Sequence, residues 1–367
     1  SVSGPKMYEI QHAWEVNRIA YGRQLFQLIR VDGSKLSYEA RLATGSFLWS
    51  RQKFDEAHKH LTLCQQINPE HEESLKLKVK LYEMQKDYEP ALPIIKKLMI
   101  NSRQGKKYEL QYGEFLEHLK QYDEVVAHYE RLIQKYPDDK PMLMSRIGQA
   151  YFERGHFAKA VDCFRSVLGA DGPEAEDPVM LRQLAAALCN EGVKFYQNAD
   201  YRPAIQYYKE ALRHDETNAD IHYNLGKAYT ETAQVSDALV HLKRAIELSP
   251  NDVASIYELA VLQDQQGVVK EAIENYRRVL ELEPGSVRAA YGLGSLHGVQ
   301  GELDQAIKYL TEAVKLDPDF EDAIYNLGVA LERQKKFNKA MTMYKKVLSI
   351  NKNHEQARSN LIHLQQS

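Results

Sequence analysis

Four tyrosines recur at one fixed interval in the second half of the chain, and they carry binding chemistry. They are Tyr223, Tyr257, Tyr291 and Tyr325, and each lies 34 residues after the previous one. A tyrosine offers apolar area and a hydroxyl group at a low cost in side-chain entropy, which suits non-covalent recognition. The same spacing also suits rings that only pack against neighbouring segments, so both roles stay open at this point.

Asparagines and cations accompany these tyrosines. An asparagine directly follows the first and the last of them, and three basic residues lie on or near the same face. Side-chain amides can grip a peptide backbone, and cations can hold acidic groups at the rim of a groove. The predicted binding surface therefore comprises Tyr223, Tyr257, Tyr291, Tyr325, Asn224, Asn326, Lys227, Arg288 and Arg333.

Three glycines, Gly292, Gly294 and Gly298, lie beside the third tyrosine. Their spacing is not that of a nucleotide-binding loop, and the periodicity places them within a helix rather than between a strand and a helix. We expect them to allow close helix packing and to open a pocket beside Tyr291.

The sequence contains no signature of catalysis, metal binding or cofactor binding. GxxxxGK[ST], HExxH and paired CxxC motifs are absent, the histidines are scattered, and Cys64, Cys163 and Cys189 are far apart. A net charge of −3 does not match the basic surface that nucleic acids require. No apolar run approaches the length that spans a membrane. We predict a non-enzymatic, cytoplasmic protein without cofactor, nucleic-acid partner or direct membrane insertion.

Small residues recur with the same period as the tyrosines. The series Ala204, Ala238, Ala272, Ala306 and Ala340 advances by 34 residues, and a parallel series of glycine or alanine runs 12 residues earlier. Within each unit, apolar residues follow helical spacing on two successive segments. Each unit therefore predicts two helices that approach each other at the small residues. A hairpin of this size cannot bury its own apolar stripe and must stack on its neighbours.

We number each unit so that the earlier small residue is position 8 and the later alanine is position 20. The units then begin at residues 38, 72, 106, 141, 185, 219, 253, 287 and 321. This pattern resembles the tetratricopeptide repeat. The resemblance implies an all-α fold: a right-handed α-solenoid of about nine helical hairpins with capping helices at both ends. It also implies that first helices line a concave groove.

Ten additional residues interrupt the register between the units at 141 and 185. The excess includes GADGPEAEDP at 169–178, which has loop composition, and one long helix is expected after it. A tolerated loop and a hinge both remain open. The predicted layout is a capping region at 1–37, four repeats at 38–168, an insertion and helix extension at 169–184, five repeats at 185–354, and a capping helix at 355–367.

The function that the resemblance implies is that of a scaffold or adaptor. It would bind an extended peptide or a partner subunit in the concave groove, within a multiprotein complex, and self-association stays open. One alternative is a regulatory module cut from a larger enzyme. A co-chaperone is disfavoured because no repeat has the lysine–asparagine pair of that class. An RNA-reading repeat is disfavoured because position 2 carries no base-reading code. A second, more basic candidate surface includes Trp14, Lys76 and Lys80.

Overall fold

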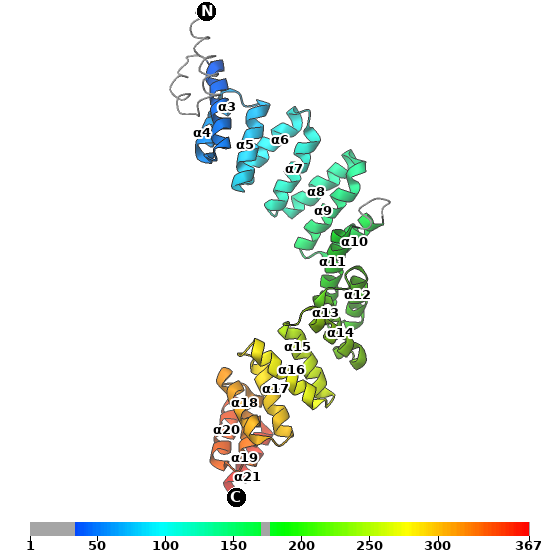
Figure 1. Ribbon diagram of the computed structural model, residues 1–367, viewed down its shortest axis with the longest axis vertical. Helices are drawn as coiled ribbons and strands as arrows, with labels where there is room; N and C mark the ends of the chain where they lie inside the picture. The colour runs from blue at the N-terminus through cyan, green and yellow to red at the C-terminus, as the bar shows by residue number, and fades with distance from the viewer. Residues whose placement is uncertain (1–33, 170–176, 367) are drawn as a thin grey trace, which may run out of the picture. The chain divides into compact units, whose positions relative to one another are not determined.

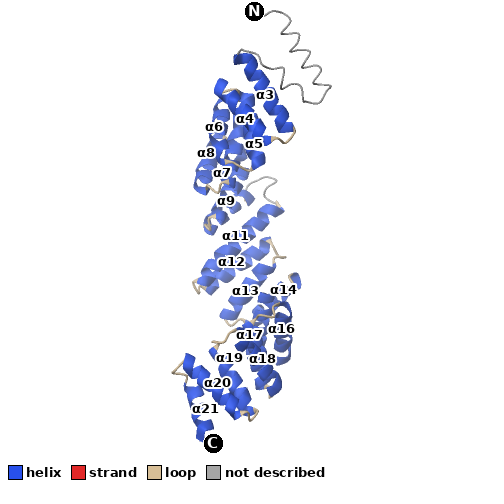
Figure 2. Cartoon of the chain, turned by 90° about the vertical axis from the view of Figure 1, so that its left-hand side faces the viewer, coloured by secondary structure: helices blue, strands red, loops and turns tan. Residues whose placement is uncertain are grey.

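The computed structural model describes residues 34–169 and 177–366, and every regular element in them is helical (Figures 1 and 2). Nineteen α-helices, α3 to α21, and two short 3₁₀ helices account for these residues. Trp14, the predicted N-terminal capping helix and most of the predicted insertion loop lie outside the described residues. The chain divides into two compact units, Ser1–Gly155 and His156–Ser367, which we call unit 1 and unit 2.

The described part of unit 1, residues 34–155, contains three helical hairpins and the first helix of a fourth repeat. It also contains two 3₁₀ helices. Glu89–Ala91 directly precedes the second helix of the second repeat, and Pro137–Asp139 directly precedes the first helix of the fourth repeat. The α-helices are α3 (Ser34–Ser50), α4 (Phe54–Ile67), α5 (Glu72–Gln85), α6 (Leu92–Asn101), α7 (Gly105–His118), α8 (Tyr122–Lys135) and α9 (Lys140–Glu153).

Unit 2 continues with hairpins of the same kind. Its helices are α10 (Phe157–Leu168), α11 (Pro178–Gln197), α12 (Tyr201–His214), α13 (Ala219–Glu231), α14 (Val235–Leu248), α15 (Val253–Gln265), α16 (Val269–Leu282), α17 (Val287–Val299), α18 (Leu303–Leu316), α19 (Glu321–Arg333), α20 (Phe337–Ile350) and α21 (Glu355–Gln366). The first helices α13, α15, α17 and α19 begin at the residues that the repeat register predicts. The long helix expected after the insertion is α11, which Asp177 caps by accepting a hydrogen bond from the Val179 amide at 2.8 Å.

The two small positions of each repeat lie where its helices meet. A Cβ atom built on Gly226 would lie 2.8 Å from Leu242 Cγ, and one on Gly328 would lie 2.7 Å from Tyr344 Cε1. Position 20 has no exposed surface in any of the nine repeats, including the one in which Val125 replaces alanine. The prediction that positions 8 and 20 are packing sites is confirmed, since a larger side chain at position 8 would enter its partner helix.

The turn inside each hairpin has a common backbone geometry. Position 15 has a positive φ in all nine repeats, although only Gly155, Gly267 and Gly301 are glycines. The other six residues include Lys86, with φ of 55°, and Lys335, with φ of 61°. The left-handed conformation costs a residue with a Cβ atom about 1–2 kcal/mol. The packing of the two helices therefore imposes a conformation that these residues do not favour by themselves.

Successive hairpins of unit 2 stack through their first helices. Each second helix packs on the first helix that follows it, and α11, α13, α15, α17 and α19 also contact one another in sequence. These first helices form one continuous surface, which we call the first-helix face of unit 2. It is the surface on which the predicted binding residues should lie.

The C-terminal helix α21 packs on the last hairpin. Ala357 is buried, and Leu361 and Leu364 pack against the core of α19 and α20. The register predicts Ile362 at position 8, the point of closest helix contact, but its side chain is 46% exposed. The physical reason is that position 8 packs against the second helix of its own hairpin, and α21 has no such helix in the described residues.

Candidate partner-binding surface

The four predicted tyrosines occupy equivalent places on α13, α15, α17 and α19, and all four are half-buried. The ring of Tyr257 packs against the second helix of its own hairpin, whereas the rings of Tyr291 and Tyr325 contact the residues that directly precede α19 and α21. The ring centroid of Tyr257 is 5.9 Å from that of Tyr276, Tyr291 is 4.9 Å from Phe320, and Tyr325 is 4.8 Å from His354. Much of each ring therefore contributes to packing, and only the remaining surface is accessible to a ligand.

The asparagines connect neighbouring first helices. Asn326 donates from Nδ2 to the Tyr291 hydroxyl at 3.3 Å, and Asn224 donates to Cys189 Sγ at 3.6 Å. Asn360 of α21 donates to the Tyr325 hydroxyl at 3.5 Å in the same register. In each case position 6 of one repeat bonds to position 5 of the repeat before it. Sequence reasoning missed Asn360, although counting position 6 into the capping helix would have found it.

Lys227 belongs to a compact network on α11, α13 and α15. Its Nζ lies 5.4 Å from the ring centroid of Tyr223, 5.3 Å from that of Tyr196, and 3.9 Å from a carboxylate oxygen of Glu258. Burial raises the pKa of Tyr223 to about 12. Burial also raises the pKa of Glu258, while Lys227 acts in the opposite direction. The lysine is therefore already engaged within the protein.

A pocket of about 300 Å³ opens between α17 and α19 on the first-helix face. Its floor includes the buried side chains of Leu310 and Ala330, and Asn326 and Arg333 contribute its polar part. We call it the α17–α19 pocket. Its lining residues are Gly294, Ser295, Gly298, Val299, Leu303, Leu310, Asn326, Val329, Ala330 and Arg333.

Of the three glycines on α17, only Gly298 has open space beside it. A Cβ atom on Gly292 would lie 2.7 Å from Tyr276 Cζ, and one on Gly294 would lie 2.6 Å from Leu310 Cγ, so neighbouring side chains already fill both spaces. A Cβ atom on Gly298 would meet nothing closer than Ala306 Cβ at 3.8 Å. The expectation that Gly292 helps to open the pocket is wrong, because the sequence does not show that Tyr276 covers it. Tyr291 itself does not line the pocket.

The cationic residues of the predicted surface differ in their surroundings. The exposed guanidinium of Arg333 donates to the Gly298 carbonyl oxygen at 3.1 Å and stands at the pocket. Arg288 is exposed at the start of α17, outside the pocket lining. Val299 beside the pocket is 78% exposed. The arrangement can accept one apolar side chain, with a hydrogen-bonding or acidic group next to it.

Within residues 34–169 and 177–366, no group of three or more histidine, cysteine, aspartate or glutamate side chains could hold a metal ion. Over the same part of the chain, every helix is too short or too polar to cross a bilayer.

Known protein families match several parts of the chain. Sequence profiles described as tetratricopeptide repeat match residues 109–139, 195–260, 257–319 and 299–361. Together these matches cover more than half of the 367 residues. No curated protein sequence matches the chain.

Solved structures resemble parts of the chain. The C-terminal part of a repeat-containing protein from Cytophaga hutchinsonii has a TM-score of 0.51 at 18% identity, covering 68% of this chain and 98% of that one. The MamA protein has a TM-score of 0.43 at 26% identity, covering 47% and 94%. YrrB, described as having an unusual peptide-binding site, has a TM-score of 0.46 at 21% identity, covering 56% and 100%. The first of these shows a shared helical-repeat fold.

Proposed function

This chain belongs to the tetratricopeptide repeat superfamily, and we propose that it acts as a non-catalytic scaffold that binds a peptide or partner subunit. The partner would lie along the first-helix face of unit 2. Stacked first helices offer an extended surface on which many modest contacts add up around a few anchors. We further propose that the protein works in the cytoplasm as part of a multiprotein complex.

The α17–α19 pocket is the observation that carries this proposal. It combines an apolar floor with the amide of Asn326 and the guanidinium of Arg333, and it lies on a face that five successive first helices make continuous. An apolar side chain of the partner would enter the pocket. The half-buried tyrosines would contribute their accessible edges along the same face rather than act as the main anchors.

The test is to fill the pocket without disturbing the fold. Gly298→Leu places a side chain in the pocket, where a Cβ atom has only ordinary contacts. Partners are first captured with the wild-type protein and identified by mass spectrometry, and the affinity of one purified partner is then measured. We expect Gly298→Leu to weaken binding by about 2 kcal/mol, roughly thirtyfold, because an anchor loses its site.

The matched control is Gly285→Leu. Gly285 lies in the turn before α17, a Cβ atom there would have no neighbour within 4 Å, and the residue does not line the pocket. This variant should bind the partner as the wild-type protein does. Equal binding by all three proteins would show that the pocket is not part of the interface.

A further inference from the structure

Positive charge is concentrated on α20 and the two turns that flank it. The sequence from 333 to 354 has seven basic residues and no acidic residue. Residues 321–367 as a whole have eight basic and four acidic residues, a net charge of +4, although the net charge of the entire chain is −3. We call the six lysines of this segment the α20 basic patch. They are Lys335, Lys336, Lys339, Lys345, Lys346 and Lys352.

The lysines of α20 lie on the side of the helix that faces away from the core. Tyr344 and Val347 are fully buried. A helical turn of about 3.6 residues places Lys339, Lys345 and Lys346 on the opposite half of the helix. Lys346 is half-buried, and the other five lysines of the patch are exposed. The patch is therefore a solvent-facing surface on a second helix, and none of its lysines lines the α17–α19 pocket.

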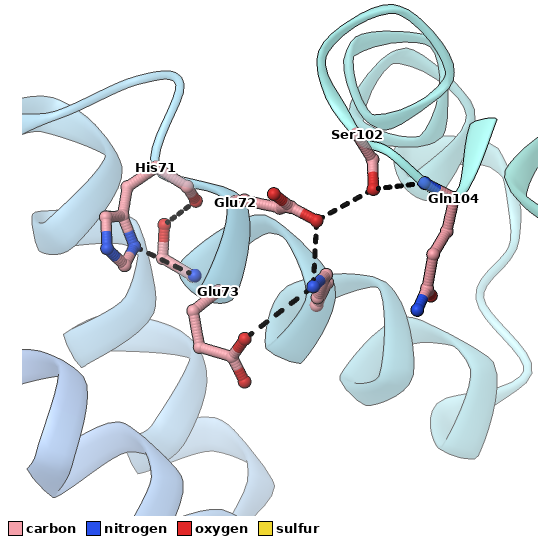
Figure 3. A network of polar contacts seen from close by, with 7 residues as sticks. His71, Glu72, Glu73, Ser102 and Gln104 are labelled. Carbon is pink, nitrogen blue, oxygen red and sulfur yellow. Dashed lines mark hydrogen bonds and ion pairs between the residues drawn. The ribbon is translucent and has the colours of Figure 1, made fainter.

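Several basic side chains in other hairpins are paired within the protein. The Lys76 ammonium, on the second candidate surface, lies 2.8 Å from a carboxylate oxygen of Glu72, and the same oxygen accepts from the Ser102 hydroxyl at 2.7 Å (Figure 3). Arg244 of α14 lies 2.9 Å from a carboxylate oxygen of Glu247. By contrast, no lysine of the α20 basic patch forms an ion pair or a ring contact within residues 34–169 and 177–366. Their charges are left to solvent or to a ligand.

The four acidic residues of the same segment lie on the neighbouring first helices and not on α20. Glu321 and Asp322 are in the first turn of α19, and Glu355 is in the first turn of α21. Glu332, near the end of α19, accepts from the Tyr344 hydroxyl at 2.6 Å. Even with all four carboxylates counted, the segment keeps its net charge of +4. It therefore attracts a surface that carries many negative charges.

The lysines at the start of α20 do not stabilise that helix. A helix N-terminus carries partial positive charge, so cations in the first turn are unfavourable there. Lys336 is the N-cap residue and makes no side-chain capping bond, and Lys335 has a left-handed backbone with φ of 61°. These positions disfavour lysine, which points to a role outside the hairpin. Neutral replacements at the start of α20 should therefore fold.

We propose that the α20 basic patch binds the surface of a lipid bilayer that contains phosphatidylserine. Clusters of about four to eight lysines or arginines are attracted to the negative potential of such a surface. An ammonium group is a hydrated point charge, which suits diffuse attraction to many headgroups better than it suits fork-like recognition of one phosphate.

Exposed apolar side chains at both ends of α20 favour a bilayer over a nucleic acid. Phe337 in the first turn is 48% exposed, and Ile350 at the end of the helix is 40% exposed. A bilayer accepts such side chains at the boundary between headgroups and acyl chains while lysines contact the headgroups. The chain lies on the bilayer in this arrangement and does not span it. The membrane surface is then separate from the partner surface on the first helices.

The experiment is co-sedimentation of the full chain with lipid vesicles at low salt. The wild-type protein should bind mixed vesicles of phosphatidylcholine and phosphatidylserine, and it should not bind vesicles of phosphatidylcholine alone. Lys336→Gln/Lys339→Gln/Lys345→Gln should weaken binding to the mixed vesicles about a hundredfold, because each lysine near an anionic surface contributes about a factor of five. Lys336→Arg/Lys339→Arg/Lys345→Arg keeps the charge and should bind as the wild-type protein does.

The matched control is Lys270→Gln/Lys308→Gln/Lys315→Gln, which removes the same charge from exposed positions on the second helices α16 and α18. This control should bind the mixed vesicles as tightly as the wild-type protein. Absence of wild-type binding to the mixed vesicles, or equal losses in the two glutamine variants, would overturn the proposal. An RNA duplex or a polyglutamate peptide that binds more tightly than the mixed vesicles and needs the same three lysines of the patch would overturn it too.

Discussion

Comparing Gly294→Ala with Gly298→Ala tests whether position 8 of the repeat is the point at which its two helices approach most closely. The two glycines lie one turn apart on α17, so both substitutions gain helix propensity, by up to about 1 kcal/mol. In Gly294→Ala the new methyl group would lie 2.6 Å from Leu310 Cγ and 3.0 Å from the Leu310 backbone nitrogen. Because backbone cannot move aside cheaply, overpacking of about 1–3 kcal/mol should outweigh the gain. At position 298 the nearest atom is 3.8 Å away, and the gain should remain.

We expect Gly294→Ala to lower stability by about 1–2 kcal/mol and Gly298→Ala to raise it by up to about 1 kcal/mol. Native-state hydrogen exchange of the α17 and α18 amides is the suitable assay, because repeats couple mainly to their neighbours and global unfolding need not be two-state. Equal shifts for the two variants, or a more stable Gly294→Ala, would refute the assignment of position 8 as the point of closest helix approach.

Other predictions follow from the turns, the histidines and the tyrosines. Lys335→Gly should stabilise α19 and α20 by about 1 kcal/mol in a urea titration, because glycine adopts the left-handed φ of 61° without the steric cost that a Cβ atom brings. Destabilisation would contradict this. His222 and His241 share an Nδ1–Nδ1 contact of 2.9 Å, and burial lowers the pKa of both below 6.5. The folded state therefore disfavours their protonation. Protection of the α13 and α14 amides, after correction for the intrinsic pH dependence of exchange, should fall from about pH 7.5 to about pH 5.5, and unchanged or greater protection would refute this. Tyr291→Phe should cost about 1 kcal/mol in thermal unfolding because Asn326 loses its acceptor; an unchanged melting temperature would argue against that bond.

Much of the fold could be predicted from the sequence because the repeat is set by contacts within one hairpin. The 34-residue period of the alanines fixes position 20, and the helix starts at 219, 253, 287 and 321 follow from it. The left-handed residue at position 15 could not be predicted in most repeats, because only three of the nine are glycines. There the close packing of two helices outweighs the local preference of a lysine, glutamine or alanine.

The candidate site was predicted less completely, because it depends on what neighbouring hairpins contribute. Spacing alone places Gly292 and Gly298 beside the same tyrosine, yet Tyr276 of the preceding hairpin covers only Gly292. Periodicity likewise places Asn326 on the first-helix face, but its bond to Tyr291 depends on the stacking distance between α17 and α19. The repeat period predicts which surface carries the site, whereas the pocket within that surface depends on which side chains of neighbouring hairpins fill the space.

The central claim is that a partner lies on the first-helix face of unit 2 at the α17–α19 pocket. The most direct measurement is photo-crosslinking to a purified partner from two exposed valines, each replaced by benzoylphenylalanine. Val299 is 78% exposed beside the pocket, and Val240 is 64% exposed on the second helix α14. Adducts located by mass spectrometry should form from position 299 and not from position 240. Adducts from position 240 with none from position 299 would contradict the account.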